Sequence, residues 1–379
     1  MRKIKLMTLL GTRPEIIRLS AVIKKCDQYF DQILVHTGQN YDYTLNGIFF
    51  KDLDLRAPDY YLDAVGADLG ETIGNIIAKS YRLMQELQPD ALLVLGDTNS
   101  CLAAISAKRL HIPIFHMEAG NRCFDECLPE ETNRRIVDHI ADVNLCYSEH
   151  ARRYLNAEGV ARERTYVTGS PMAEVLRANL PAVERSDVLQ RLGLAPRYYI
   201  LLSSHREENI DTDENFQALF NSVNALARKY DLPILYSCHP RSRKRLEQMN
   251  FNLDERVQLH EPLGFHDYNN LQMNAYCVVS DSGTLPEESA FFAGAGHPFP
   301  AVCIRTSTER PEAMEKGCFI LAGITPGGVE QAVQMAVELQ ENGDFGLPVP
   351  DYTEDVSVKV VKLIQSYVGV VNTMVWRKR

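Results

Sequence analysis

Residues 111–135, HIPIFHMEAGNRCFDECLPEETNRR, decide how the rest of the chain is interpreted. The stretch opens with a short apolar run and continues into polar residues, which is typical of a buried strand followed by a loop and a helix start. Two carboxylates, Glu118 and Glu130, and the guanidinium of Arg134 follow the apolar run. Ligands of open α/β sheets bind at the carboxyl ends of the strands. The stretch therefore predicts a functional edge of a parallel sheet.

Short apolar runs alternate with helical patterns through the first half of the chain. This alternation predicts βαβ units and a parallel sheet. The predicted strands are residues 4–10, 32–37, 91–95, 112–116, 143–147 and 165–167. The predicted helices are residues 15–25, 70–87, 100–110, 131–140 and 149–158.

The same alternation restarts in the second half. A chain of 379 residues exceeds the roughly 250–300 that one core accommodates, so two domains are expected. We predict an N-terminal domain over residues 1–178, a crossing over 179–197, a C-terminal domain over 198–353 and a last helix over 354–379 that packs back on the first domain. The predicted strands of the second half are residues 199–203, 233–237, 257–259, 277–280 and 302–305, and the helices are 214–229, 242–249, 268–274, 285–292, 329–341 and 355–367.

Composition narrows the functional classes. A formal net charge of -10 argues against nucleic-acid binding, which requires a basic face. Most of the nine cysteines stand in apolar runs, which indicates buried thiols in a reducing compartment. Cys123 and Cys127 would need two further ligands at suitable spacing to hold zinc, so no metal is predicted. The N-terminus resembles a first strand rather than a signal peptide, and no run reaches the ~20 apolar residues of a membrane span, so we expect a cytoplasmic protein.

Polar motifs follow the predicted strands of the first half. Residues 11–15, GTRPE, join a strand to a helix whose N-terminal N–H groups suit an anion, with Arg13 and Arg18 nearby. The single glycine differs from the three of the dinucleotide fingerprint, so no NAD is predicted. Asp97 follows the strand at 91–95, where it is either a helix cap or a partner of Glu118 at the same sheet edge.

Comparable motifs follow the strands of the second half. His205 and Arg206 come after the first of them, and the histidine is either a general acid–base or a solvated loop residue. Ser282 and Gly283 open a helix and are placed to meet phosphate, whereas the carboxylate of Glu288 suits a ribose diol. An aromatic such as Tyr268 can stack on a base, although most aromatics at such positions belong to the core. These motifs indicate a bound nucleoside diphosphate.

Taken together, the motifs resemble those of the non-hydrolysing UDP-N-acetylglucosamine 2-epimerase family over residues 4–325. The resemblance is carried by residues 11–15, 96–98, 118–120, 129–134, 205–206, 281–288 and 308–312. It implies a GT-B-like fold of two Rossmann-like, doubly wound domains with a cleft between them. It also implies a UDP-sugar substrate, no cofactor and a homodimer.

The family reaction inverts C2 of a UDP-2-acetamido sugar. The C2 proton and UDP leave by elimination, and re-addition with a proton from the other face gives the epimer. The resemblance places the acid–base roles on Asp97, Glu118, Glu130 and His205. It places substrate binding on Arg13, Arg18 (where the family has Lys), Arg134, Arg206, Tyr268, Ser282, Gly283, Glu288 and Arg310.

Several segments differ from the glucosamine enzymes. Residues 204–208 are SHREE where those enzymes have GHRRE, and residues 281–284 are DSGT where they have DSGG. Residues 97–100, 118–125 and 169–172 resemble the branch that converts UDP-2-acetamido-2,6-dideoxy-L-talose to UDP-N-acetyl-L-fucosamine for capsule or O-antigen synthesis. The alternatives are a UDP-N-acetylglucosamine/UDP-N-acetylmannosamine 2-epimerase, a GT-B glycosyltransferase and a non-catalytic nucleotide-sugar sensor.

Overall fold

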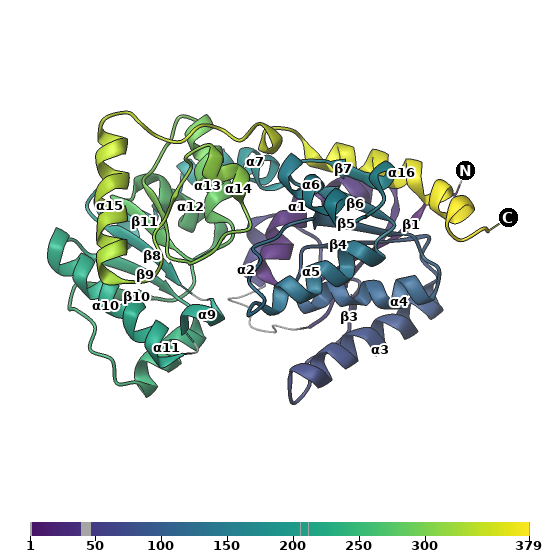
Figure 1. Ribbon diagram of the computed structural model, residues 1–379, viewed down its shortest axis with the longest axis horizontal. Coiled ribbons are helices and arrows are strands. Elements are labelled where there is room, and N and C mark those ends of the chain that lie inside the picture. Colours follow the sequence, from purple (N-terminus) through teal and green to yellow (C-terminus); the bar gives the residue numbers. More distant parts are fainter. Residues whose placement is uncertain (1, 39–46, 205, 211, 379) are drawn as a thin grey trace. The chain divides into compact units, whose positions relative to one another are not determined.

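A computed structural model describes residues 2–38, 47–204, 206–210 and 212–378. His205, one of the predicted catalytic residues, lies outside these ranges. The chain divides into two compact units, and each is described by itself (Figure 1). Unit 1 is Met1–Val175 with Asp351–Arg379, and unit 2 is Leu176–Pro350. Within the described ranges, the helices are too short or too polar for a membrane span.

Unit 1 is built on a seven-stranded parallel sheet in the order β3-β2-β1-β4-β5-β6-β7. Its strands are β1 (Lys5–Leu10), β2 (Asp31–His36), β3 (Tyr60–Tyr61), β4 (Ala91–Leu95), β5 (Ile114–Ala119), β6 (Val143–Cys146) and β7 (Thr165–Val167). Its helices are α1 (Arg13–Tyr29), α2 (Gly47–Asp52), α3 (Leu69–Leu87), α4 (Ala103–Arg109), α5 (Pro129–Ile140), α6 (Glu149–Ala157) and α16 (Val356–Met374). Helix α7 (Met172–Glu184) begins in unit 1 and continues into unit 2.

Helices cover both faces of the unit 1 sheet, as the apolar strands require. On one face, Met7, Leu92 and Val94 pack against α3, α4 and α5. On the other face, α1 packs against α16, so the last helix of the chain belongs to the same unit as the first strand. The chain's single tryptophan, Trp376, follows α16 and stacks on His111 at a centroid distance of 4.3 Å.

Unit 2 is built on a six-stranded parallel sheet in the order β10-β9-β8-β11-β12-β13. Its strands are β8 (Ile200–Ser204), β9 (Ile234–Cys238), β10 (Val257–His260), β11 (Cys277–Ser280), β12 (Ala301–Cys303) and β13 (Ile320–Leu321). Its helices are α8 (Val188–Leu192), α9 (Glu207–Ile210), α10 (Asp213–Tyr230), α11 (Pro240–Gln248), α12 (Phe265–Asn274), α13 (Leu285–Gly294), α14 (Pro311–Glu315) and α15 (Pro326–Glu341). One core packs this sheet against α10, α11 and α15.

Both sheets reverse their strand order at one place, between β1 and β4 in unit 1 and between β8 and β11 in unit 2. Doubly wound sheets bind ligands outside the carboxyl ends of the strands at this switch point. Among the described residues, those that follow the strands there are residues 11–12 and 96–98 in unit 1, and Arg206 and residues 281–284 in unit 2. The two Rossmann-like α/β domains predicted from the sequence are confirmed.

Some elements differ from those predicted. The central strand of the opening stretch, predicted at residues 112–116, is β5 at Ile114–Ala119, so Glu118 lies within the strand rather than after it. Residues 179–197, predicted as a crossing with one short helical turn, contain the short helix α8 and also the end of α7. Strands β3 and β13 were not predicted, because two residues are too few to show an alternating pattern.

Candidate active site

Glu118 is held in place by its backbone and by its carboxylate. Its φ is +65°, a left-handed conformation that costs a residue other than glycine on the order of 1–3 kcal/mol. The register with β6 shifts at the same point, between Met117 and Ala119. Arg18 Nη1 lies 2.9 and 3.1 Å from the two carboxylate oxygens, and Asn121 Nδ2 donates to Oε1 at 3.1 Å. Strained backbone of this kind persists only where the surroundings determine it, as these contacts do.

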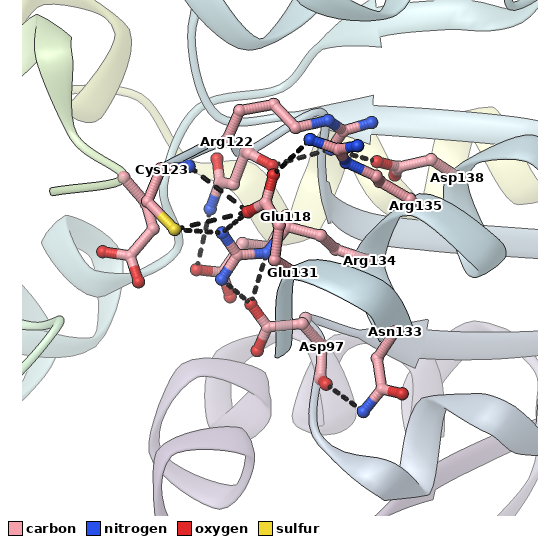
Figure 2. A network of polar contacts seen from close by, with 12 residues as sticks. Asp97, Glu118, Arg122, Cys123, Glu131, Asn133, Arg134, Arg135 and Asp138 are labelled. Atoms are coloured by element: carbon pink, nitrogen blue, oxygen red, sulfur yellow. Dashed lines mark hydrogen bonds and ion pairs between the residues drawn. The ribbon is translucent and has the colours of Figure 1, made fainter. Parts of the chain in front are cut away.

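Asp97, directly after β4 and Gly96, is the second carboxylate at this edge. Arg134 of α5 donates to Asp97 Oδ2 through Nε at 3.0 Å and Nη2 at 2.5 Å. The same guanidinium donates through Nη1 to Glu131 Oε2 at 2.9 Å, and Asn133 Nδ2 donates to the Asp97 carbonyl at 2.9 Å (Figure 2). Helix α5 therefore fixes both the side chain and the backbone of Asp97.

Beneath these carboxylates lies a buried charge network centred on Asp138 of α5. Arg122 Nη1 donates to Asp138 Oδ2 at 2.7 Å, and His116 Nδ1 of β5 lies 2.9 Å from Asp138 Oδ1. The Gly120 N–H lies 3.2 Å from both oxygens. Asp138, His116 and Arg122 are 0–1 % exposed. Burial alone would raise the pKa of the Asp138 carboxyl, but His116 and Arg122 hold that pKa below its usual value.

Glu15, in the first turn of α1, bonds the backbone of the turn that precedes this helix. Glu15 Oε2 accepts the N–H groups of Gly11 at 3.0 Å and Thr12 at 2.8 Å, so the chain's own carboxylate occupies them. Its other oxygen accepts from Ser100 in the loop after β4. Burial raises the pKa of Glu15, although these hydrogen bonds oppose the rise. Glu15 therefore joins the two loops at the switch point of unit 1.

In unit 2, Asp281 has a comparable role. Its Oδ2 accepts from Ser204 Oγ at 2.8 Å, from the Arg206 N–H at 3.0 Å and from Asn209 Nδ2 at 3.1 Å. Asn209 also donates to the Ile304 carbonyl at 3.0 Å. The loop after β8 is therefore tied to the loop after β11 through one fully buried carboxylate.

The arginines of this edge form longer ion pairs. Arg206 Nη2 lies 3.6 Å from Glu309 Oε1, and Arg310 Nη2 lies 3.5 Å from Glu287 Oε2. The Arg206 guanidinium also lies against Gly283, where an added Cβ would come within 3.0 Å of Nη2. A residue larger than glycine at position 283 would therefore displace Arg206.

The remaining predicted residues lie on the same elements. Arg13 is the first residue of α1 and lies 5.6 Å from the Phe49 ring centroid. Glu130 is half-buried in the first turn of α5, and Tyr268 is half-buried in α12. Glu288 Oε2 accepts from Gln272 Nε2 at 2.6 Å. The N–H of Ser282 donates to Ser280 Oγ at 3.0 Å, so it bonds within the chain.

Sequence reasoning missed the residues that hold the candidates in place. Asn121 and Asp138 were not singled out, and Glu131 and Asp281 were noted only as parts of motifs. A signal was present, because Glu131 stands three residues before Arg134 and seven before Asp138, and such residues share one helix face. Among the described residues, there is no group of three or more His, Cys, Asp or Glu side chains placed to hold a metal ion. Cys123, considered above as a zinc ligand, donates from Sγ to Glu131 at 3.3 Å.

Comparisons with known proteins agree with this arrangement. The family model described as UDP-N-acetylglucosamine 2-epimerase matches residues 24–364. A Methanococcus maripaludis protein named UDP-N-acetylglucosamine 2-epimerase is 33% identical over 355 residues, which cover 90% of this chain and 94% of that protein. A Rickettsia bellii structure described as UDP-N-acetylglucosamine 2-epimerase has a TM-score of 0.91 at 44% identity, with all of both chains covered. A Methanocaldococcus jannaschii UDP-GlcNAc 2-epimerase, solved in complex with UDP-GlcNAc and UDP, has a TM-score of 0.89 at 30% identity, with 96% of this chain and 100% of that chain covered.

Proposed function

Because the chain belongs to the UDP-N-acetylglucosamine 2-epimerase family, we propose that it is a non-hydrolysing isomerase that inverts C2 of a UDP-2-acetamido sugar. The observation that carries the proposal is Glu118, a buried carboxylate held by Arg18 and Asn121 on a strained backbone at the carboxyl end of β5. Such a group is suited to proton transfer, because its position is fixed before substrate binds. Asp97, Glu130 and His205 are the other proposed acid–base residues.

The proposed reaction balances as an elimination followed by its reverse. A carboxylate of unit 1 removes the C2 proton, the C1–O bond to UDP breaks, and a double bond forms between C1 and C2. UDP then adds back to C1 while a second acid delivers a proton to the opposite face of C2. Two acid–base groups are therefore required. Asp97 follows β4, and Glu118 lies at the carboxyl end of the neighbouring strand β5.

Retention of UDP between the two steps is assigned to unit 2. Arg206 and Arg310 are proposed to meet the diphosphate, since arginine forks match phosphate oxygens. Glu288 is proposed to bind the ribose hydroxyls, supported by the hydrogen bond that orients its carboxylate. Arg13, Arg18 and Arg134 of unit 1 are proposed substrate-binding residues as well, with Tyr268, Ser282 and Gly283 of unit 2.

The identity of the sugar is a separate proposal. Residues 97–100, 118–125 and 169–172 favour UDP-2-acetamido-2,6-dideoxy-L-talose, with UDP-N-acetyl-L-fucosamine as the product. The names of the relatives favour UDP-N-acetylglucosamine instead. We propose the L-sugar first and a role in capsule or O-antigen synthesis, with the enzyme acting as a homodimer.

A panel of UDP-sugars in D₂O tests the proposal. Each sugar is incubated with the protein and followed by NMR for deuterium at C2 and for the epimer. Deuterium incorporation without any acceptor is expected, and it separates an epimerase from a glycosyltransferase. Faster turnover of UDP-N-acetylglucosamine than of the L-talose derivative would overturn the choice of sugar. A complete lack of exchange with every UDP-2-acetamido sugar would overturn the epimerase proposal itself.

A further inference from the structure

His116 is a fully buried histidine that the proposed reaction does not use. It lies on β5, two residues before Glu118, and its side chain is 0 % exposed. Its Nε2 lies 2.8 Å from the carbonyl oxygen of Gly96, the residue before Asp97. Its Nδ1 lies 2.9 Å from Asp138 Oδ1, which is an ion-pair distance. One ring therefore contacts β4, β5 and α5.

The two contacts determine how many protons the ring carries. A backbone carbonyl only accepts hydrogen bonds, so Nε2 must carry a proton toward Gly96. A lone pair on Nδ1 would face a carboxylate oxygen at 2.9 Å, which is repulsive, so Nδ1 must carry a proton as well. The ring is then an imidazolium. Burial would lower the pKa of His116, but Asp138 and the Gly96 carbonyl hold that pKa above its usual value.

The surroundings of His116 balance this charge. Asp138 faces it from α5, and Asp97 lies nearby after β4. Arg122 bonds Asp138 from the loop after β5 and pairs with Glu158, which ends α6, at 2.6 Å. The two buried cations, His116 and Arg122, thus face the buried carboxylate of Asp138, and Arg122 is also paired with Glu158, an exposed residue. Buried charges are tolerated only when they are paired in this way.

We infer that His116 is a positioning residue, which in its doubly protonated form joins the backbone beside Asp97 to the backbone beside Glu118. Nε2–H holds the Gly96 carbonyl, and Nδ1–H faces the carboxylate that also accepts the Gly120 N–H. This link keeps Asp97 and Glu118 in a fixed position relative to each other. The inference rests on the proposed function, because it assigns proton transfer to these two carboxylates.

A second buried histidine of unit 1 provides a matched comparison. His36, at the end of β2, is 2 % exposed. Its Nδ1 accepts the Gly38 N–H at 3.0 Å, so that nitrogen carries no proton and the ring is neutral. Burial lowers the pKa of His36 to about 4. The two histidines therefore differ in charge although both are buried in the same sheet.

The charge states are tested first, without turnover. The full-length protein is labelled with ¹⁵N-histidine, and the ring nitrogens are observed at pH 8 by two-bond ¹H–¹⁵N correlation, with His116→Gln and His36→Gln for assignment. Two protonated nitrogens are expected for His116 and one for His36. A neutral His116 at pH 8 would overturn the inference whatever the activity of the protein, so this outcome is separate from failure of the proposed function.

Turnover then tests the positioning role. In His116→Gln, kcat should fall by about 10–100-fold, because small displacements of reacting groups have effects of that order, while KM and the affinity for UDP stay within a few-fold. In Asp138→Asn, His116 should lose its second proton, and the fall in activity at alkaline pH should begin at lower pH. Phe115→Leu alters the opposite face of β5 and is the control for a loss of stability alone. A folded His116→Gln protein with the wild-type kcat would overturn the inference and leave the epimerase proposal intact.

Discussion

The two units present their switch-point loops with different electrostatics. In unit 1, Arg18 and Arg134 lie 2.5–3.1 Å from the oxygens of Glu118 and Asp97. In unit 2, the ion pairs of Arg206 and Arg310 with glutamates are 3.6 and 3.5 Å long. Charge-assisted hydrogen bonds are normally about 2.7–2.9 Å long. Arg18 and Arg134 of unit 1 are therefore tightly bonded to the chain's own carboxylates. In unit 2, the contacts of Arg206 with Glu309 and of Arg310 with Glu287 are longer, although Arg305 holds Glu309 at 2.7 Å.

This difference corresponds to the two tasks of the proposed reaction. Proton transfer requires carboxylates in fixed positions, and short arginine contacts provide that. Retention of UDP requires cations that can exchange a glutamate partner for phosphate at moderate cost, and longer pairs are suited to that. Substitutions in unit 1 should therefore lower kcat, and substitutions in unit 2 should weaken nucleotide binding.

The largest effect is expected for Glu118→Gln. The amide keeps the shape of the side chain but cannot accept a proton from C2, so kcat should fall by about 10²–10⁴-fold while UDP affinity is unchanged. Steady-state turnover and calorimetric titration with UDP measure the two quantities. Glu163→Gln, an exposed change elsewhere in unit 1, is the control. Near-normal turnover of Glu118→Gln would contradict the assignment of proton transfer to Glu118, and with it the proposed division of tasks between the two units.

A smaller loss is expected for Arg18→Met. The guanidinium that fixes Glu118 is removed, and misplacement of the carboxylate should lower kcat by about 10²-fold. Arg18→Lys keeps a cation on a shorter side chain and should retain more activity than Arg18→Met, because an ammonium group can still pair with the Glu118 carboxylate. Equal activity in the two variants would show that the contact with Glu118 does not serve catalysis.

Much of the fold was predictable from the sequence. The alternation of apolar runs and helical patterns predicted parallel sheets, and the polar motifs at residues 96–98 and 281–284 lie at the two switch points. The helix predicted from residue 149 begins there as α6, and the side chain of Ser148 before it accepts from the Ala151 N–H at 3.4 Å. Such features are local, because adjacent residues determine them.

The contacts that organise the site were less predictable. Arg18 and Glu118 are 100 positions apart, and Ser204 and Asp281 are 77 apart. Only the strand order brings these pairs together, and the sequence pattern does not specify that order. The strand boundary at Glu118 was misplaced for a related reason, since its left-handed backbone is supported by Arg18 and Asn121 rather than by neighbouring residues.

For unit 2, Arg310→Ala should weaken UDP binding by about 10–100-fold, because hydrogen bonds to charged groups contribute about 1.5–3 kcal/mol. At saturating substrate, kcat should change less than KM. Arg245→Ala removes an ion pair of the same unit with Asp213 and serves as the control. Unchanged UDP affinity in Arg310→Ala, or an equal loss in Arg245→Ala, would contradict the assignment of nucleotide binding to this edge.

The smallest effect on the site is expected for His36, whose protonation should change the stability of unit 1 in acid without affecting the candidate active site. His36 has a folded pKa of about 4, below its unfolded value near 6.5, so the unfolded state binds the proton first. Its stabilising contribution is therefore complete above pH 6.5 and is lost as the pH falls toward 4, by about 3 kcal/mol. The raised pKa of His116 gives the opposite pH dependence. Its contribution to stability is complete below pH 6.5 and is lost as the pH rises through the folded pKa.

Denaturant titrations between pH 4 and 9, followed by fluorescence of Trp376 in unit 1, measure both contributions to the free energy of unfolding. His36→Gln should remove the loss of stability in acid while leaving the loss at alkaline pH. Equal acid slopes in the wild type and in His36→Gln would show that the acid-labile charge lies elsewhere, and the contrast between the two buried histidines would fail.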